Sequence, residues 1–174
     1  MPSLVTVTRI ISGAQTGADR GALDFALEKG FDYGGWCPKN RKAQDGRIPD
    51  IYANLEETMD QGYTTRTRWN VRDSDGTVIF TNNPPGKGSA LTIRSCLDQG
   101  KPYLVVTLEE SIMESSCNIL GFIRRNQIKT LNVAGSRIET WHHRVRLVLR
   151  RAFADQDFSL DKLKQEAQAD AGKR

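Results

Sequence analysis

Short apolar runs alternate with helix-like stretches along most of the chain, and this alternation constrains the fold more than any other feature. Three of the runs are rich in β-branched residues and end in a glycine-bearing turn: Arg9–Ser12, Thr77–Thr81 and Thr130–Gly135. Strands that alternate with helices predict a mostly parallel sheet covered on both faces. We therefore expect an α/β fold, a Rossmann-like three-layer sandwich.

The remaining elements follow from apolar spacing and from start and stop signals. A helix is expected over Ala18–Lys29, where Thr16 and Asp19 resemble a capping box and Gly30 is a stop signal. Further strands are expected at "YGGWCP" and at "YLVVTL", and the second of these is apolar enough to suggest a buried strand. The other expected helices are Glu56–Trp69, Ser89–Gln99 with Ala90, Ile93 and Leu97 inward, one around Cys117–Ile123, and one with Trp141, Val145, Val148, Leu149 and Ala152 along a stripe.

The 174 residues suit one domain, which we assign to residues 1–154, followed by a polar and partly disordered tail over 155–174. The net charge of +4 mildly favours anionic ligands and is too small to imply nucleic acid. The three cysteines are scattered without a C-x-x-C pair, which argues against a disulfide framework and a protein-bound metal. With no leader or long apolar segment visible, we expect a cytoplasmic protein with no membrane contact.

Three glycine turns are expected to meet at one edge of the sheet: "SGAQTG", "NNPPGKGS" and "AGSR". Parallel strands end at the same edge, and ligands of open α/β sheets bind there. Helix N-termini at these turns carry free amides and a partial positive charge, which attract phosphate or carboxylate. Each turn alone is weak evidence, because many strand-to-helix turns need glycine, but together they favour an anion pocket.

The first of these turns fits neither standard phosphate-binding pattern. The spacing of Gly13, Gly17 and Gly21 excludes G-x-G-x-x-G, and no Lys-Ser or Lys-Thr pair follows Gly17 as a P-loop requires. We therefore interpret the turn as one wall of a pocket made by several loops.

The segment "RTRWNVRDSDG" brings three arginines, an asparagine and two aspartates next to a strand. Spacing alone favours a solvated helix end and an aspartate-rich turn. The alternative is that Arg66, Asn70 and Asp73 line the ligand pocket.

Five stretches together resemble a known family: "GAQTGADRGALDFA", "GGWCPKNRKAQDGRIP", "RTRWNVRDSDGT", "GKGSALT" and "LNVAGSR". They are similar to the molybdenum carrier proteins, the circularly permuted branch of the SLOG nucleotide-ligand superfamily, in the same order from Arg9 to Ala152. The resemblance implies a Rossmann-like fold and a pocket for a nucleotide-derived or phosphate-bearing ligand. Molybdenum cofactor, whose pterin bears a phosphate, is one such ligand.

Phosphoribohydrolases of the wider superfamily carry the signature P-G-G-x-G-T-x-x-E, which "PGKGSALT" resembles in its phosphate-binding half. One glycine is missing, and Thr92 stands where the catalytic glutamate would fall. A threonine supplies no carboxylate for acid–base work, so the departure argues against hydrolase activity and leaves binding intact.

Three hypotheses follow, of which a binding protein for a phosphate-bearing, nucleotide-like ligand is preferred. The alternatives are a nucleotide N-glycosidase, for which Asp73 and Asp19 are the only candidate carboxylates, and, less favoured, a DNA-processing module. A homo-oligomer is expected by analogy with relatives. The candidate ligand-binding residues are Gly13, Gln15, Thr16, Gly17, Asp19, Arg66, Asn70, Asp73, Gly86, Gly88, Ser89, Gly135, Ser136 and Arg137.

Overall fold

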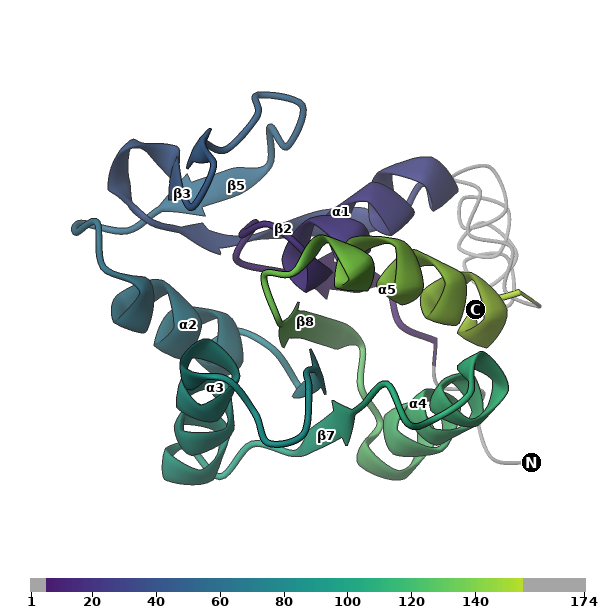
Figure 1. Cartoon of the computed structure of the whole chain (residues 1–174). Helices are drawn as coiled ribbons and strands as arrows, with labels where there is room; N and C mark the ends of the chain where they lie inside the picture. Colours follow the sequence, from purple (N-terminus) through teal and green to yellow (C-terminus); the bar gives the residue numbers. More distant parts are fainter. Residues whose placement is uncertain (1–5, 155–174) are drawn as a thin grey trace, which may run out of the picture.

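The computed structural model describes residues 6–154, which form a six-stranded sheet with helices on both faces (Figure 1). The strand order is β5-β2-β1-β8-β6-β7, and every neighbouring pair is parallel. The strands are β1 (Arg9–Ile11), β2 (Asp32–Cys37), β5 (Leu55–Glu57), β6 (Gly76–Phe80), β7 (Tyr103–Val106) and β8 (Thr130–Gly135). The Rossmann-like α/β prediction is confirmed.

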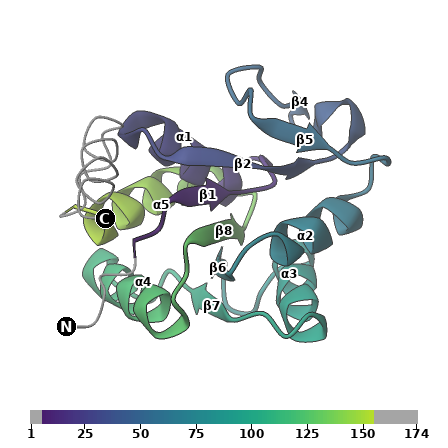
Figure 2. The ribbon, with the colours of Figure 1, turned by 180° about the vertical axis from the view of Figure 1, so that it is seen from behind.

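One helical layer contains α1 (Ala18–Lys29), α5 (Glu139–Ala152) and α4 (Ile112–Asn126), and the other contains α2 (Tyr63–Arg72) and α3 (Lys87–Asp98). The view from behind shows the same two layers on either side of the strands (Figure 2). A short helix, η1 (Lys39–Arg41), leads into a hairpin of β3 (Lys42–Ala43) and β4 (Gly46–Arg47), which lies between β2 and β5 in the chain.

The core lies between the sheet and the α1–α5 layer. The predicted stripe of α5 is buried there, with Trp141, Val145, Val148 and Leu149 at most 1% exposed. The helices approach closely at Gly21, where an added Cβ would lie 2.5 Å from the carbonyl oxygen of His142. A side chain at this position would force the two helices apart, so the glycine serves packing.

The α1 helix has the predicted bounds and ends at Gly30 in the left-handed conformation, but it begins differently from the prediction. The expected capping box of Thr16 and Asp19 is wrong. Gly17 is the N-cap and no side chain caps the helix. Asp19 instead accepts a hydrogen bond from the Gln15 amide, one turn further back in the loop.

Two predictions on the α2–α3 layer are wrong. The segment expected as a helix from Glu56 begins with β5, because an edge position beside β2 favours strand pairing there, and α2 starts only at Tyr63. In α3 the expected inward residues Ala90 and Leu97 are exposed, whereas the buried ones are Ser89, Thr92, Ser95 and Cys96.

The strand at "YLVVTL" is the edge strand β7 and not a central one. Of its four residues only Val106 is fully buried, because β6 covers one side and no strand of the described chain covers the other. The predicted tail, 155–174, lies outside the described residues. Within residues 6–154, no helix is long and apolar enough to cross a membrane.

Candidate functional site

The three glycine turns follow β1, β6 and β8, which are neighbours in the sheet, so their carboxyl ends meet as predicted. A cleft of about 490 Å³, here called the outer chamber, opens at this edge. Its walls are Gln44, Thr81, Asn82, Pro84, Gly86, Lys87, Gly88, Ser89, Gly135, Ser136, Arg137 and Ile138. The second and third turns thus provide most of the lining.

A smaller space of about 40 Å³, the inner chamber, adjoins the outer chamber, with which it shares Gly88, Gly135 and Arg137. It lies between the end of β8 and the helices α2 and α3. Its other lining residues are Gly13, Gln15, Asp19, Tyr63, Arg66, Thr67, Asn70, Leu91, Thr92, Asn132 and Ala134.

The N-terminus of α3 opens onto the outer chamber. Gly86 is the N-cap, and no side chain caps the helix. The first amides of a helix have no acceptor within it, and they carry the positive end of the helix dipole. A Cβ added to Gly86 or Gly88 would meet nothing within 4 Å, so these glycines keep the approach to the amides open.

Two cations beside these amides have no acidic partner. No carboxylate of residues 6–154 forms an ion pair with Lys87 or Arg137, although both line the outer chamber. The Arg137 guanidinium lies 5.2 Å from the centre of the Tyr63 ring, and the Arg66 guanidinium lies 5.6 Å from the same ring. The mouth of the cleft therefore has an electropositive wall.

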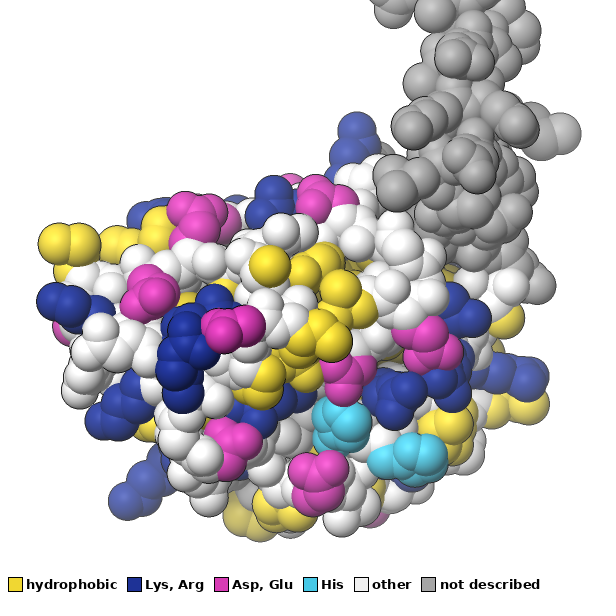
Figure 3. Space-filling view, turned by 90° about the horizontal axis from the view of Figure 1, so that it is seen from above, with side chains coloured by type: hydrophobic (Ala, Val, Ile, Leu, Met, Phe, Trp, Pro, Cys, Tyr) yellow, Lys and Arg dark blue, Asp and Glu magenta, His cyan; other side chains and the backbone are white. Residues whose placement is uncertain are grey.

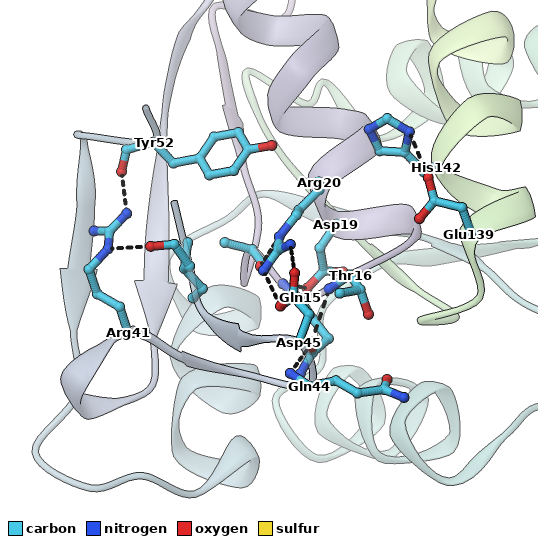
Figure 4. Close-up of polar contacts among 12 residues, drawn as sticks. Gln15, Thr16, Asp19, Arg20, Arg41, Gln44, Asp45, Tyr52, Glu139 and His142 are labelled. Atoms are coloured by element: carbon cyan, nitrogen blue, oxygen red, sulfur yellow. Dashed lines mark hydrogen bonds and ion pairs between the residues drawn. The ribbon is translucent and has the colours of Figure 1, made fainter. Parts of the chain in front are cut away.

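The first turn is organised around hydrogen bonds of Gln15 (Figure 4). The Gln15 amide donates to Asp19 at 3.1 Å, and the Gln15 side-chain oxygen accepts from the amides of Thr16 and Gln44 at 3.1 and 2.9 Å. These bonds join α1 to the β3–β4 hairpin. The backbone amides of the candidate ligand-binding residues Gln15 and Thr16 are therefore engaged within the chain.

Gly17 joins the first turn to the third. Its φ of 80° and the 2.3 Å between an added Cβ and the carbonyl oxygen of Ser136 exclude larger residues. The same carbonyl accepts a hydrogen bond from the Ala18 amide at 2.9 Å. Thr16 and Gly17 are not among the residues that line the two chambers.

Asp19 and Arg66 form a buried ion pair in the inner chamber. Arg66 Nη1 lies 3.0 Å from Asp19 Oδ2, and the two side chains are 12% and 3% exposed. Burial raises the pKa of Asp19, and the charge of Arg66 opposes this rise only in part. The guanidinium packs over Gly13, where an added Cβ would lie 1.6 Å from Nη1.

Two predicted site residues, Asn70 in α2 and the C-cap Asp73, form hydrogen bonds within the chain. Asn70 pairs with the backbone of Trp36, accepting from its amide at 2.8 Å and donating to its carbonyl at 2.9 Å, so it clamps α2 to β2. Asp73 lies outside both chambers. It pairs with Arg72 at 2.6 Å and accepts from the Trp36 indole at 2.7 Å, and the hydrogen bond from Arg72 lowers its pKa.

The structure brings several residues to the cleft that the sequence did not reveal. Gln44 arrives on the β3–β4 hairpin, Tyr63 at the start of α2, and Asn132 from the middle of β8. A polar residue inside the apolar run "TLNVAG" was the one available signal, because a buried strand that carries asparagine must satisfy its amide.

The comparisons with known proteins agree with this arrangement. Residues 10–150 match the model of the Circularly permutated YpsA SLOG family. The chain belongs to this family. Among solved structures it is similar to one named "Putative molybdenum carrier protein" from Syntrophus aciditrophicus SB, with 40% identity and a TM-score of 0.81. That likeness covers 84% of this chain and 94% of the other. A comparison with curated proteins finds no match.

Proposed function

We propose that this protein binds a small phosphate-bearing, nucleotide-like ligand in the outer chamber and acts as a carrier. The observation that carries the proposal is the uncapped N-terminus of α3, which opens onto the chamber beside Lys87 and Arg137. Free helix amides, a helix dipole and two unpaired cations converge there, and such a combination favours a phosphate group.

Molybdenum cofactor is the ligand that the name of the similar structure suggests. Its phosphate suits the N-terminus of α3, and the outer chamber is of the size typical of small-molecule sites. Among residues 6–154, no group of three or more His, Cys, Asp and Glu side chains could hold a metal ion. We therefore propose that such a ligand is held through its organic part, with Arg137 and Ser89 on its phosphate.

Titration calorimetry with ribose 5-phosphate, and with ribose as the uncharged control, tests the phosphate site. Ribose 5-phosphate should bind and ribose should not. Arg137→Ala removes a charge-assisted hydrogen bond and should weaken binding about tenfold. Arg125→Ala is the matched control, because Arg125 lies at the end of α4 and lines neither chamber. Equal binding by all three proteins would contradict the proposal.

The identity of the ligand is tested with native protein. Mass spectrometry of molecules that copurify with it should find a phosphate-bearing heterocycle, and elemental analysis should find molybdenum if the ligand is the cofactor. A phosphate-bearing molecule without molybdenum would retain the binding function and reject the carrier assignment.

We also propose that the protein forms a homo-oligomer in the cytoplasm, through the free edge of β7. Leu97, Leu108 and Met113 are 61%, 45% and 56% exposed on the elements around this strand. Light scattering after size exclusion tests the state, and Leu97→Glu should reduce the mass if this edge is the interface. A DNA-processing role finds less support, because the face shown in Figure 3 mixes acidic and basic side chains.

A further inference from the structure

Asn132 leaves an unpaired hydrogen-bond acceptor in the wall of the inner chamber. The residue is 2% exposed, and its Nδ2 donates to the Thr77 hydroxyl at 3.1 Å on the neighbouring strand β6. Its Oδ1 is buried without a partner. Buried polar atoms in folded proteins are nearly always hydrogen-bonded, so an exception inside a cleft requires a physical reason.

Arg66 leaves an unpaired donor in the same chamber. Its Nη1 is committed to Asp19 at 3.0 Å, while its Nε is buried without a partner. The Asp19 pair, the Tyr63 ring and the close contact with Gly13 restrict the guanidinium to this place. Because the guanidinium is held in place, its unpaired Nε–H points in a fixed direction.

Two further polar side chains of the chamber are already engaged. Asn70 uses both ends of its amide on the backbone of Trp36, and the Thr92 hydroxyl donates to the Gly88 carbonyl at 3.1 Å. Among buried unpaired side-chain atoms of residues 6–154, Asn132 Oδ1 is the one acceptor, and the others are arginine Nε atoms. Two buried atoms of residues that line the chamber therefore lack a partner: Asn132 Oδ1 has no donor, and Arg66 Nε has no acceptor.

We propose that Asn132 and Arg66 determine specificity by reading the edge of a nitrogen heterocycle, a ring that carries an N–H or NH₂ donor near an acceptor. This inference rests on the proposed function, because it places the ring of the same ligand whose phosphate lies at the N-terminus of α3. The inner chamber takes only the edge of the ring, since its volume is about 40 Å³. The rest of the ring extends through the shared wall of Gly88, Gly135 and Arg137 into the outer chamber.

The shared chemistry is a ring amidine or lactam edge, which purine and pyrimidine bases and pterins all present. A sugar phosphate without a base satisfies the phosphate site but leaves Asn132 unpaired. A ring that carries only acceptors places an acceptor opposite Asn132 Oδ1, which is itself an acceptor, so no hydrogen bond forms. The inner chamber thus discriminates between ligands by the presence of a donor on the ring and not by their phosphate.

The test measures binding of adenosine 5′-monophosphate, purine riboside 5′-monophosphate and ribose 5-phosphate to the full chain. The first two differ only in the amino group of the base. We expect adenosine monophosphate to bind about tenfold more tightly than purine riboside monophosphate, because one buried acceptor is satisfied in one complex and not in the other. A further arm uses 6-hydroxymethylpterin, which carries the same kind of edge without ribose, and distinguishes a pterin from a nucleobase as its source.

Variants of Asn132 test whether this residue causes the preference for the amino group of the base. Asn132→Leu should abolish the preference for the amino group and leave ribose 5-phosphate binding unchanged. Asn132→Asp keeps an oxygen acceptor at this position and should retain the preference. Should Asn132→Leu fail to fold, the comparison of the two ring ligands on the unchanged protein still decides the matter.

The outcomes separate the two proposals. If ribose 5-phosphate binds and the two ring ligands bind equally, the specificity role is overturned and the phosphate site stands. If 6-hydroxymethylpterin binds in a manner that Asn132→Leu abolishes while no phosphate compound binds, the phosphate proposal falls and the specificity role stands. Binding of none of these probes overturns both.

Discussion

Arg66 Nη1 donates to Asp19 Oδ2 at 3.0 Å and thereby ties α2 to the first turn of α1 across the inner chamber. The pair lies against the first glycine turn, where Arg66 packs over Gly13 and Asp19 accepts from the Gln15 amide. The turn thus holds an arginine of its own chain against Gly13.

Gly13→Ala should destabilise the fold through Arg66 and not through the backbone. The φ of Gly13 is not among the positive ones, so alanine fits the chain, but its Cβ would lie 1.6 Å from Arg66 Nη1. The guanidinium must move, and the buried Asp19 loses its partner. We expect a loss of about 1–3 kcal/mol in the free energy of unfolding, below the full cost of deleting one member of a buried pair. Urea denaturation measures it.

A double-mutant cycle gives the control for this prediction. In an Arg66→Ala background there is no guanidinium to displace, so Gly13→Ala should change the free energy of unfolding by less than about 0.5 kcal/mol. An equal loss in both backgrounds would mean that Gly13 matters for another reason.

The ends of elements that are marked by glycine are the part of the fold that the sequence predicts best. Gly30 ends α1 in the left-handed conformation, and Gly135 ends β8, so these two elements have the predicted bounds. Such signals are local. The strand at Leu55 was missed because only its pairing with β2, a tertiary contact, makes it a strand.

The inward face of α3 was missed for a different physical reason. Its buried residues are small and polar, and two of them satisfy their hydroxyls inside the helix: Ser95 donates to the Leu91 carbonyl at 2.8 Å and Thr92 to the Gly88 carbonyl at 3.1 Å. Apolar spacing therefore indicated the opposite face. The same reasoning explains why Asn132, a polar residue in a buried strand, did not enter the predicted site.

Asn70→Leu should separate α2 from β2. The substitution removes both hydrogen bonds to the Trp36 backbone, at 2.8 and 2.9 Å, and leaves the partly buried N–H and C=O of Trp36 without these partners. We expect a loss of about 2–4 kcal/mol in the free energy of unfolding. Asn126→Leu is the control, since Asn126 makes one comparable bond to the Phe122 carbonyl at the end of α4 and should cost about 1 kcal/mol or less. Equal losses in the free energy of unfolding for the two variants would contradict the proposal that Asn70 holds α2 against β2.

Tyr52 should keep its proton in the folded protein at pH values where a free tyrosine ionises. Burial is the main cause of its raised pKa, and the hydrogen bond to Asp24 Oδ1 at 2.7 Å adds to it. Above the ordinary value of 10 the unfolded chain ionises this phenol while the fold does not. The contribution of Tyr52 to stability is therefore complete below pH 10 and declines as the pH rises further.

Absorbance at 295 nm and urea denaturation check this prediction. The native titration of Tyr52→Phe should match that of the unchanged protein up to the pH of unfolding, because Tyr52 stays protonated in the fold. The stability gap between the two proteins, about 1 kcal/mol near neutral pH, should narrow above pH 10. A native ionisation lost in Tyr52→Phe would show that the phenol is accessible.

Incubation with nucleoside monophosphates should release no base. Asp73 lies outside both chambers, and Thr92, which lines the inner chamber, has no carboxylate and donates its hydroxyl to the Gly88 carbonyl. Asp19 remains as a cleft carboxylate, but its Oδ2 is bonded to both the Gln15 amide and Arg66. Without a free carboxylate to assist cleavage of the N-glycosidic bond, chromatography after prolonged incubation should recover intact nucleotide. Base release that Asp19→Asn abolishes and Asp73→Asn leaves unchanged would instead identify Asp19 as the catalytic carboxylate and make the protein an enzyme.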